Sequence, residues 1–556
     1  MIRRALYRGF SAIAGPKIKA IVAASKAPRE SQAQRLMAMV ERDANTAFGR
    51  EHGFGLIRSV EDFQRAVPIR EYEQIRPYIE RATHGEKNVL TAQNPLMFAT
   101  TSGTTAKPKY IPITAQYMEE FRQASVVSGF HLYQTYPQLD RGVALSVVSP
   151  AQEGLTEGGI PYGAISGQLF QHEPFLVKRF ISPIPYEVFL IADYENRYYT
   201  LLRLALVLPL SFFYTLNPST INLLMRRLRQ HAPQLIADIR KGSITPPSNA
   251  LDDKTLKAIK RFMQADPERA DALQYLLDSD QWRAFRIWPT LSLVSCWTKA
   301  AAAYYLTDFP QEFGDIPVCD ITYGASEGRG TVFMGPGQQM LALQSHFFEF
   351  VPESEMGKPD APVLLADQLQ VGQNYFILFT TSSGLYRYNI NDVVRVTGMY
   401  NRTPCLEFQY KGGNISSFTG EKITELQVTT AVLQAERDIN TRLRFFTVIP
   451  EFRPEPHYEI WAEPEHAHAD TATLEDFAES LSRAVDRRLS EINVEYATKR
   501  ESARLSDVTA RVLESGGYEA FRRHLTASGV ADAQIKVSHL NPKEGVKQFF
   551  ADKIKS

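Results

Sequence analysis

The spacing of hydrophobic residues changes along the chain, and each spacing predicts a different kind of element. Between residues 30 and 80, apolar side chains recur at helical intervals in SQAQRLMAMVERDA, SVEDFQRAVP and EYEQIRPYIERATHGE, which predicts a run of amphipathic helices. Ser59 stands where a helix cap is expected, and Pro68 stands where that helix should end. A further long amphipathic helix is predicted after Thr114, which is a suitable cap residue.

The centre of the chain alternates between apolar runs and loops. GVALSVVSP predicts a short strand, and TLSLVSCW and DIPVCDITYG predict buried strands. Residues 190–310 are otherwise predicted to be largely helical. The most apolar stretch, Leu201–Phe213, is short for a membrane span and contains Arg203 and Pro209, which favours a buried helix. From residue 340 to 400, alternation and β-branched residues predict a strand-rich region.

The pattern changes once more at FQYKGGNISSFTGEK, a linker rich in glycine and serine. A predicted helix, two strands and a charged helix follow it, as expected for a small α/β domain. We therefore predict a large domain over residues 1–410, a hinge over 411–420 and a small domain over 421–556. The predicted fold class is α/β, with mixed β-sheets and helices in the large N-terminal domain and a small mobile C-terminal α/β domain.

Composition and charge narrow the classes of function. Hydrophobic residues make up 44% of the chain, which is enough for a full core. Lys and Arg together number 62, as do Asp and Glu, so there is no basic excess that would indicate a nucleic-acid partner. The three cysteines lie far apart and match neither a disulfide framework nor a zinc site, which favours a reducing, cytoplasmic location.

The N-terminal stretch MIRRALYRGFSAIAGPKIKAIVAASK is basic, and Arg8, Pro16, Lys17 and Lys19 interrupt its apolar residues. A signal peptide needs an unbroken apolar core, so we expect a surface helix instead. Peripheral contact with a membrane is the alternative, and no integral membrane segment is expected.

The first candidate for chemistry is the stretch TTSGTTAKPKY, which follows an apolar run. Small hydroxylated residues and glycine let backbone N–H groups approach an anion, and lysines add positive charge, as a polyphosphate requires. The spacing differs from that of the P-loop motif. A polar turn between two strands explains the same residues, so this stretch by itself leaves both interpretations open.

Two later stretches place carboxylates at strand ends. In DITYGASEG, an apolar strand leads into Tyr323 and Glu327, and ligands of open α/β sheets bind beyond the carboxyl ends of the strands. Glu327 could reach a Mg²⁺ ion that bridges phosphates, or it could be only a carboxylate in the first turn of a helix. In SSGLYRYNINDVVRVTGMYN, Asp392 could accept both hydroxyls of a ribose, or it could be only a turn aspartate.

In this order, the three stretches resemble the signature of adenylate-forming enzymes, and the chain is similar to one branch of them, the GH3 family of acyl acid amido synthetases. The resemblance extends over nearly the whole chain and includes FGREHGF, EGGIPYGAISG, HFFEFVP, GLYRYNINDVVRVTGMYNRTP and SFTGEKITE. It implies the adenylate-forming fold, with ATP and Mg²⁺ as cofactors. It also implies a monomer that acts on a small-molecule carboxylic acid and an amine, expected to be an amino acid.

The resemblance also implies a role for each matching residue. Glu327 would bind Mg²⁺ and take part in catalysis, Asp392 would hold the ribose, and Phe347 would pack near the adenine. Lys422 and Lys536 would be catalytic lysines, and Lys536 would bridge negative charge during adenylation, although the residues alone allow both to be solvated surface lysines. The implied nucleotide-binding residues are Thr101, Ser102, Gly103, Thr104, Thr105, Lys107, Lys109, Thr322, Tyr323, Gly324, Ala325, Ser326, Glu327, Phe347 and Asp392.

The chain departs from the family pattern at three places. Ala106 stands where the wider superfamily usually has glycine, and the tail Lys536-Val-Ser-His539 lacks the family's arginine. Plant members that bind small acids carry an arginine at about Val127–Gly129, whereas the nearest arginine here is Arg122. Recognition of the acid's carboxylate is therefore expected to differ from that in the plant members.

The leading hypothesis is an ATP-dependent ligase that adenylates a carboxylic acid, releases pyrophosphate and transfers the acyl group to an amine. One alternative is an acyl-CoA synthetase-like enzyme with coenzyme A as acceptor. Another is a nucleotide-binding homologue without catalysis, which Ala106 and the missing tail arginine would explain. His131 and His172 are expected near the substrate pocket, where either could accept the proton of the amine or serve only as a hydrogen-bonded structural residue.

Overall fold

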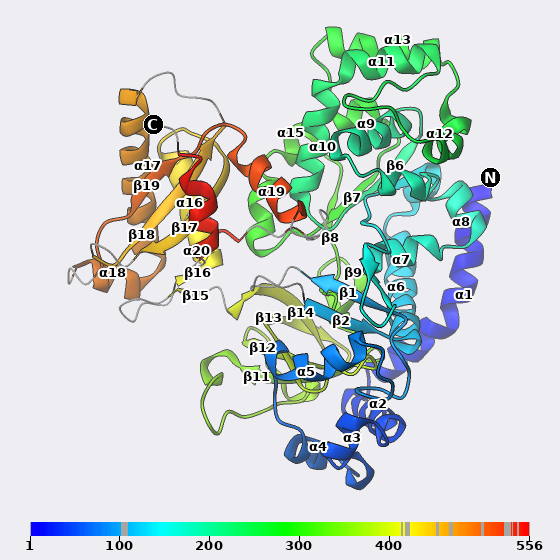
Figure 1. Ribbon diagram of the computed structural model, residues 1–556, viewed down its shortest axis with the longest axis vertical. Coiled ribbons are helices and arrows are strands. Elements are labelled where there is room, and N and C mark those ends of the chain that lie inside the picture. The colour runs from blue at the N-terminus through cyan, green and yellow to red at the C-terminus, as the bar shows by residue number, and fades with distance from the viewer. Residues whose placement is uncertain are drawn as a thin grey trace. The chain divides into compact units, whose positions relative to one another are not determined.

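The structure is a computed structural model (Figure 1). It describes residues 2–101, 109–412, 415–416, 423–451, 455–465, 471–501, 505–527, 535, 538–541 and 544–554. The chain forms two compact units. The first consists of Met1–Thr298, Tyr305–Ile390 and Arg395–Glu407, and the second of Lys299–Tyr304, Asn391–Val394 and Phe408–Ser556.

The helices of the first unit include those that were predicted between residues 30 and 80. No helix in the described part of the chain is both long and apolar enough to cross a membrane. The bounds are α1 Ile2–Ala24, α2 Pro28–Asp43, α3 Ala47–Glu51, α4 Val60–Ala66, α5 Tyr72–Thr83, α6 Ala115–Thr135, α7 Ile165–Gln171, α8 Phe175–Phe180, α9 Tyr194–Ala205, α10 Pro218–Gln230, α11 Ala232–Lys241, α12 Asp253–Ile259, α13 Pro267–Asp278, α14 Ala284–Ile287 and α15 Phe309–Phe313.

Helix starts follow the sequence signals closely. The Ser59 hydroxyl accepts a hydrogen bond from the backbone N–H of Asp62 at 3.1 Å, and the Thr114 hydroxyl accepts one from the N–H of Tyr117 at 3.2 Å. Both predicted caps are therefore confirmed. The N-terminal helix α1 packs along α6, where Tyr7 stacks on Tyr133 with ring centroids 4.3 Å apart (Figure 1).

Three sheets belong wholly or mainly to the first unit. Their strand orders are β2-β1-β5-β4, β3-β6-β7-β8 and β11-β12-β13-β14-β10-β9. The bounds are β1 Met97–Thr101, β2 Lys109–Ile113, β3 Val143–Ser146, β4 Gly154–Leu155, β5 Pro161–Gly163, β6 Leu210–Tyr214, β7 Leu293–Cys296, β8 Val318–Asp320, β9 Thr331–Gly335, β10 Gln338–Leu341, β11 Phe347–Pro352, β12 Asn374–Thr380, β13 Tyr388–Tyr400 and β14 Thr403–Lys411.

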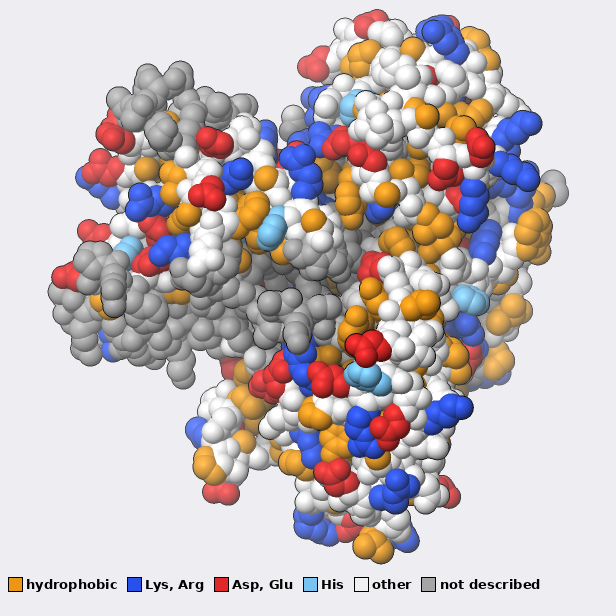
Figure 2. Space-filling model, viewed as in Figure 1, with side chains coloured by type: hydrophobic (Ala, Val, Ile, Leu, Met, Phe, Trp, Pro, Cys, Tyr) orange, Lys and Arg blue, Asp and Glu red, His pale blue; other side chains and the backbone are white. Residues whose placement is uncertain are grey.

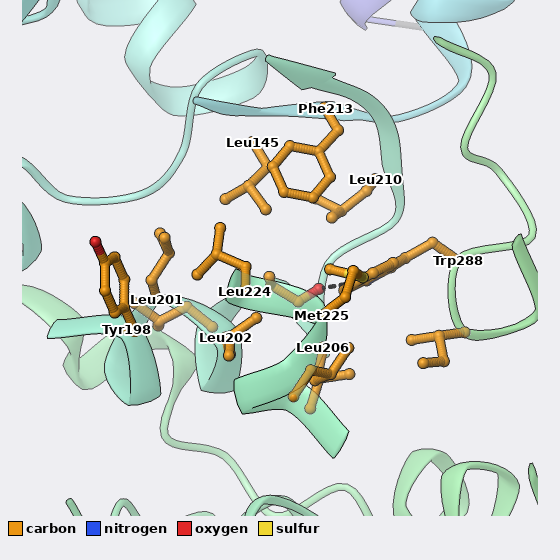
Figure 3. Close-up of a cluster of buried hydrophobic side chains, with 14 of the residues drawn as sticks. Leu145, Tyr198, Leu201, Leu202, Leu206, Leu210, Phe213, Leu224, Met225 and Trp288 are labelled. Carbon is orange, nitrogen blue, oxygen red and sulfur yellow. Dashed lines mark hydrogen bonds between the residues drawn. The ribbon is translucent and has the colours of Figure 1, made fainter. Parts of the chain in front are cut away.

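The sheet β3-β6-β7-β8 is parallel throughout. Its strands are short, and β7 is buried throughout, as predicted and as is usual for parallel strands that are covered by helices. The prediction of a buried strand at β8 is wrong in part, because Val318 is exposed and β8 is the last strand of the sheet. Figure 3 shows the core on one side of it, where Leu202 of α9, Leu224 of α10 and Phe213 of β6 belong to one cluster of buried side chains. Trp288 is buried in the same core and its indole N–H donates to the backbone oxygen of Ala205 at 2.9 Å.

The stretch Leu201–Phe213 corrects one prediction. Its first part ends helix α9 at Ala205, but Leu210–Tyr214 is strand β6 rather than a continuation of the helix. Pro209 cannot continue a helix, and the aromatic residues that follow it favour a strand. The fully buried guanidinium of Arg203 donates to the backbone oxygens of Ser243 and Asp238 at 3.1 and 3.2 Å.

The second unit has its own sheet and core. Strands β17 and β18 pair antiparallel, and β18 and β19 pair parallel. The core contains Phe445, Trp461, Tyr518, Phe521 and Phe550. The bounds are β15 Ile415–Ser416, β16 Ile423–Thr424, α16 Glu425–Asp438, β17 Leu443–Glu451, β18 His457–Pro464, α17 Thr471–Ile492, α18 Val494–Glu501, β19 Thr509–Val512, α19 Gly517–Ala527 and α20 Glu544–Ala551.

The surface carries charges of both signs. On the face drawn in Figure 2, Lys and Arg side chains are interspersed with Asp and Glu side chains in the described parts of both units. This arrangement agrees with the equal numbers of basic and acidic residues in the sequence.

Candidate active site

The DITYGASEG motif forms a hairpin at the carboxyl end of the parallel strand β8. The Tyr323 carbonyl accepts from the N–H groups of Gly330 and Thr331 at 2.9 and 3.0 Å. Ala325 and Gly328 exchange two backbone hydrogen bonds, at 2.9 and 3.3 Å. Ser326 and Glu327 therefore occupy the tip of a tight turn, at the edge of the sheet where open α/β folds bind their ligands.

Two glycines allow this hairpin to pack closely. A Cβ at Gly330 would lie 2.2 Å from the ring of Tyr323, and a Cβ at Gly328 would lie 2.6 Å from the ring of Phe379 and 3.1 Å from that of His346. Neither position can accept a larger residue without displacing these rings. The hairpin, to which we refer as the Tyr323–Thr331 hairpin, is thus fitted against the six-stranded sheet.

Tyr117 of α6 and His346, the residue directly before β11, hold the hairpin from the protein interior. The Tyr117 hydroxyl donates to the backbone oxygen of Ser326 at 3.0 Å. The ring of Tyr117 stacks on His346, with ring centroids 5.6 Å apart. His346 Nε2 lies 3.0 Å from the backbone N–H of Arg329. Two points of the hairpin are therefore bonded to buried side chains.

His346 accepts the hydrogen bond from Arg329 because it is neutral. The imidazole is fully buried, and burial lowers its pKa to about 3. A neutral ring that accepts at Nε2 carries its proton on Nδ1. His346 Nδ1 has no hydrogen-bond partner among the described residues. Within the described part of the chain, the Nδ1–H of His346 thus has no acceptor, whereas Nε2 accepts from the backbone N–H of Arg329 in the hairpin.

A buried carboxylate below the hairpin connects three parts of the first unit. Glu120 on α6 accepts from the Ser382 hydroxyl at 2.6 Å and from Gln116 Nε2 at 2.8 Å. It also forms an ion pair with Arg35 of α2, which in turn donates to the backbone oxygen of Ser345 at 3.0 Å. Sequence reasoning missed Tyr117, Glu120 and His346. Tyr117 and Glu120 bond to residues that lie more than 200 positions away along the chain, and no local pattern pairs His346 with Arg329.

Glu327 is the candidate metal ligand. Its side chain lies in the hairpin turn and is only 7% exposed. No group of three or more His, Cys, Asp and Glu side chains in the described part of the chain could hold a metal by itself. A single carboxylate fits Mg²⁺ that is bound mainly through substrate phosphates. Whether Glu327 plays this part stays a prediction.

The other predicted nucleotide-binding residues that the structure describes fall into separate places. Tyr323 to Ser326 form the start of the hairpin, and Thr322 directly precedes it. Lys109 on β2 lies with its Nζ 5.0 Å from the centroid of the Tyr72 ring. Asp392 belongs to the second unit, where it accepts from Lys411 Nζ at 3.0 Å. Their contacts with a nucleotide stay predictions.

Phe347 is fully buried, and it lies on the opposite face of β11 from His346 and Phe348. Its ring meets Phe63 of α4 edge-on, with centroids 6.2 Å apart, whereas Phe348 meets His346 and Phe379. The role of Phe347 beside the adenine also stays a prediction. Several other predicted residues lie outside the described part of the chain: Ser102, Gly103, Thr104, Thr105, Lys107, Lys422, Lys536 and the side chain of Thr101.

Three family models match the chain in order. The GH3 family N-terminal domain matches residues 17–318, the central domain matches residues 339–411, and the C-terminal domain matches residues 426–544. The chain belongs to the GH3 family. Relatives include the jasmonoyl–L-amino acid synthetase JAR6 of Nicotiana attenuata, which is 25% identical over 91% of this chain and 90% of the relative. The indole-3-acetic acid-amido synthetase GH3.4 of Arabidopsis thaliana is 24% identical over 94% of this chain and 90% of the relative.

Solved structures of related proteins confirm the predicted α/β fold class. The GH3.15 acyl acid amido synthetase matches with a TM-score of 0.83 at 22% identity, over 96% of this GH3 chain and 95% of its own. A 2-hydroxyisobutyryl-CoA ligase in its postadenylation state matches with a TM-score of 0.51 at 11% identity, over 94% and 91%. The GH3 chain therefore has the adenylate-forming fold.

Proposed function

We propose that this protein is an acyl acid amido synthetase, an ATP-dependent ligase that joins a carboxylic acid to an amine, with an amino acid as the acceptor. The observation that carries the proposal is the Tyr323–Thr331 hairpin, which presents the buried Glu327 at the carboxyl edge of a parallel sheet. It lies within a chain that is similar over 90% or more of its length to relatives named as amino acid synthetases. Pyrophosphate-forming ligation suits both facts.

In the first step, a carboxylate oxygen of the acid attacks the α-phosphorus of ATP. The bond from that phosphorus to the bridging oxygen breaks, and pyrophosphate leaves with the bonding electrons. Bound Mg²⁺ would neutralise charge on the phosphates, with Glu327 as one of its ligands. Tyr117 and His346 contribute by fixing the hairpin, so that positioning rather than covalent catalysis lowers the barrier. Lys536 is proposed to assist the same step.

In the second step, the nitrogen of the amine attacks the acyl carbon, the bond from carbon to the AMP oxygen breaks, and the nitrogen loses a proton. We propose that the small domain turns about residues 411–420 between the steps, because one pocket then serves two reactions. His172 is exposed and its Nδ1 contacts the Gln168 carbonyl oxygen at 2.8 Å, whereas His131 Nε2 is buried without a hydrogen-bond partner among the described residues. His131 is the better candidate for a base.

Cellular setting and assembly are part of the proposal. Cys296, Cys319 and Cys405 are free and buried, and burial raises the pKa of the Cys319 and Cys405 thiols to about 11. Inert thiols of this kind suit a reducing compartment. We therefore propose a cytoplasmic location, and we propose a monomer because the family resemblance implies one.

The test is release of pyrophosphate from Mg·ATP across a panel of aryl, indole and fatty acids. Each acid is supplied with and without a mixture of amino acids, and the products are identified by mass spectrometry. Acid-dependent release and an amide mass that needs the amino acid are expected. A thioester that forms only when coenzyme A is added would mean that coenzyme A, and not an amine, is the acceptor. ATP binding without release for any acid would contradict the ligase and favour a nucleotide-binding homologue.

A further inference from the structure

The residue directly after the GASEG motif, Arg329, places a positive charge inside the first unit without a matching negative one. Its side chain is partly buried. Nε donates to the backbone oxygen of Thr331 at 3.3 Å, and one Nη lies 3.5 Å from the Ser128 hydroxyl. Among the described residues, the contacts of its guanidinium are all with neutral groups. An arginine keeps its proton inside proteins, so the site holds an uncompensated cation.

The surroundings of Arg329 are aromatic and neutral. The guanidinium carbon lies 5.2 Å from the centroid of the Phe121 ring. Burial lowers the pKa of the guanidinium, and the hydroxyls of Tyr117 and Tyr214 oppose that shift only in part. A ring face gives a cation modest stabilisation, and removing part of a charge from water without a paired anion costs free energy. An arrangement of this kind suits a ligand that supplies an anion.

Helix α6 provides the rest of the site. Phe121 and Ser128 are seven residues apart and therefore lie on one helix face, with His131 one turn further. Ser128 also accepts from the backbone N–H of Phe333 at 3.1 Å, so its position is fixed by β9. His131 Nε2 is buried and has no hydrogen-bond partner among the described residues. A second polar group thus lacks a partner on the face that Arg329 contacts.

We propose that the Arg329 guanidinium receives the carboxylate of the acyl acid before it is adenylated, an assignment that rests on the proposed function. The Tyr323–Thr331 hairpin would then carry both recognition charges. Glu327 would face the metal and phosphates, and Arg329, two residues later, would face the attacking carboxylate. Because the main-chain N–H of Arg329 is bonded to His346, the hairpin fixes the position of the guanidinium.

The first experiment measures whether carboxylates occupy this position, using phenylglyoxal, a small reagent that modifies guanidinium groups. The full chain is treated alone or with benzoate, indole-3-acetate or octanoate, and modified residues are located by mass spectrometry. At a saturating concentration, at least one carboxylate should slow modification of Arg329 by about tenfold or more. The matching primary amides, benzamide, indole-3-acetamide and octanamide, should protect much less, because they carry no charge.

Arg122 is the matched control within the same protein. It lies on α6, is half exposed and pairs with Glu119 at 2.7 Å, so its modification should be the same with and without each carboxylate. An Arg329 that does not react, that no carboxylate of the panel protects, or that amides protect equally would overturn the assignment. Protection of Arg122 alone would move the carboxylate site to that residue.

The second experiment compares Arg329→Gln and Arg329→Lys by kinetics. Both substitutions keep the backbone N–H that His346 accepts. Arg329→Gln should raise KM for the acid by about 10- to 100-fold, as expected for loss of a hydrogen-bonded charge, and leave KM for ATP within about twofold. Arg329→Lys should fall between Arg329→Gln and the wild type, because lysine keeps the charge but not the fork. Arg122→Met should match the wild type.

A structural role for Arg329 predicts a different result. In that case, the preference of the protein for an acid over its primary amide, measured as the ratio of their inhibition constants, would survive Arg329→Gln. The proposal requires that this preference be lost. If carboxylates protect Arg329 but no pyrophosphate is released, the ligase is contradicted and the carboxylate site is supported. If pyrophosphate is released but Arg329 is not protected, the ligase is supported and the carboxylate site is contradicted.

Discussion

The first unit contains two buried regions that are built from different kinds of residue. Below the parallel sheet, Leu202, Phe213, Leu224 and Trp288 form an almost entirely apolar core (Figure 3). Below the Tyr323–Thr331 hairpin, the buried residues include Tyr117, Glu120 and His346, which bear polar or charged groups, beside the rings of Phe348 and Phe379. Burial of the apolar core stabilises the fold roughly in proportion to the apolar surface area that it removes from water. The polar region gains little, since each hydrogen bond replaces one to water.

The difference shows what each region is for. An apolar core tolerates changes that conserve volume, so its geometry is not tightly specified. A buried polar network tolerates few arrangements, because any unpaired donor or acceptor is costly. Placing such a network under Glu327 and Arg329 fixes their backbone at the expense of stability. We therefore expect the apolar core to determine whether the chain folds, and the polar region to determine how the hairpin is held.

The largest expected effect is on stability, from the apolar core. Leu202→Ala should lower the free energy of unfolding by about 2–5 kcal/mol, because it removes a fully buried side chain and leaves a cavity. Chemical denaturation of the first unit measures it. Leu256→Ala on α12, where the side chain is 40% exposed, is the control and should change stability by less than about 0.5 kcal/mol. Equal losses of stability in Leu202→Ala and Leu256→Ala would contradict the role given to the apolar core.

His346→Leu should have the next largest effect. It removes the acceptor of the Arg329 N–H and leaves that donor buried, at a cost of about 1–3 kcal/mol. His346→Gln, whose side-chain oxygen can accept in place of Nε2, should recover part of the loss. At a temperature where all variants are folded, the rate of pyrophosphate release should fall in the His346→Leu variant and fall less in the His346→Gln variant. Identical activity for both variants would mean that the hairpin does not need this bond.

A smaller effect should appear in the pH dependence of stability. The folded protein holds the pKa of His346 at about 3, below the ordinary value of about 6.5 for an unfolded chain. The unfolded state therefore binds a proton first as the pH falls, and this group contributes stability above pH 6.5 that is lost on acidification. Between pH 6 and pH 4, the contribution falls by up to about 1.4 kcal/mol per pH unit. The His346→Gln variant should show a shallower slope, and parallel slopes would contradict the burial.

The smallest effect should come from Tyr117→Phe. It removes the donor to the Ser326 carbonyl and keeps the ring that stacks on His346. The loss of stability should be about 1 kcal/mol, with a measurable fall in pyrophosphate release. Tyr275→Phe on α13, where the side chain is 66% exposed, is the control. A fall in release that is no greater than in Tyr275→Phe would remove the hydroxyl from the account.

Local signals in the sequence predicted local structure well. Ser59 and Thr114 cap their helices because a cap depends only on the next three residues. The strand before Tyr323 was predicted from its own apolar residues, whereas the first turn of a helix, one interpretation of Glu327, is wrong because the chain forms a hairpin there. Strand β6 was missed because its apolar run follows a helix almost directly, and the change of period is visible only at Pro209.

The parts of the site that join distant residues could not be predicted. Ser128 and Arg329 are 201 residues apart in the sequence, and nothing local to either indicates the other. The sequence drew attention to Arg122 because it is nearest in number, but that residue is paired with Glu119 at the surface. Only the packing of α6 along β9 brings Arg329 to the helix face.

The central claim is that the Tyr323–Thr331 hairpin is an adenylation site, and exchange of labelled pyrophosphate into ATP tests it most directly. The wild type should exchange only when a suitable acid is present. Glu327→Gln keeps the shape of the side chain and removes its charge, so exchange should fall by about 100- to 1,000-fold while the protein stays folded. Acid-dependent exchange by Glu327→Gln at the rate of the wild type would contradict the claim.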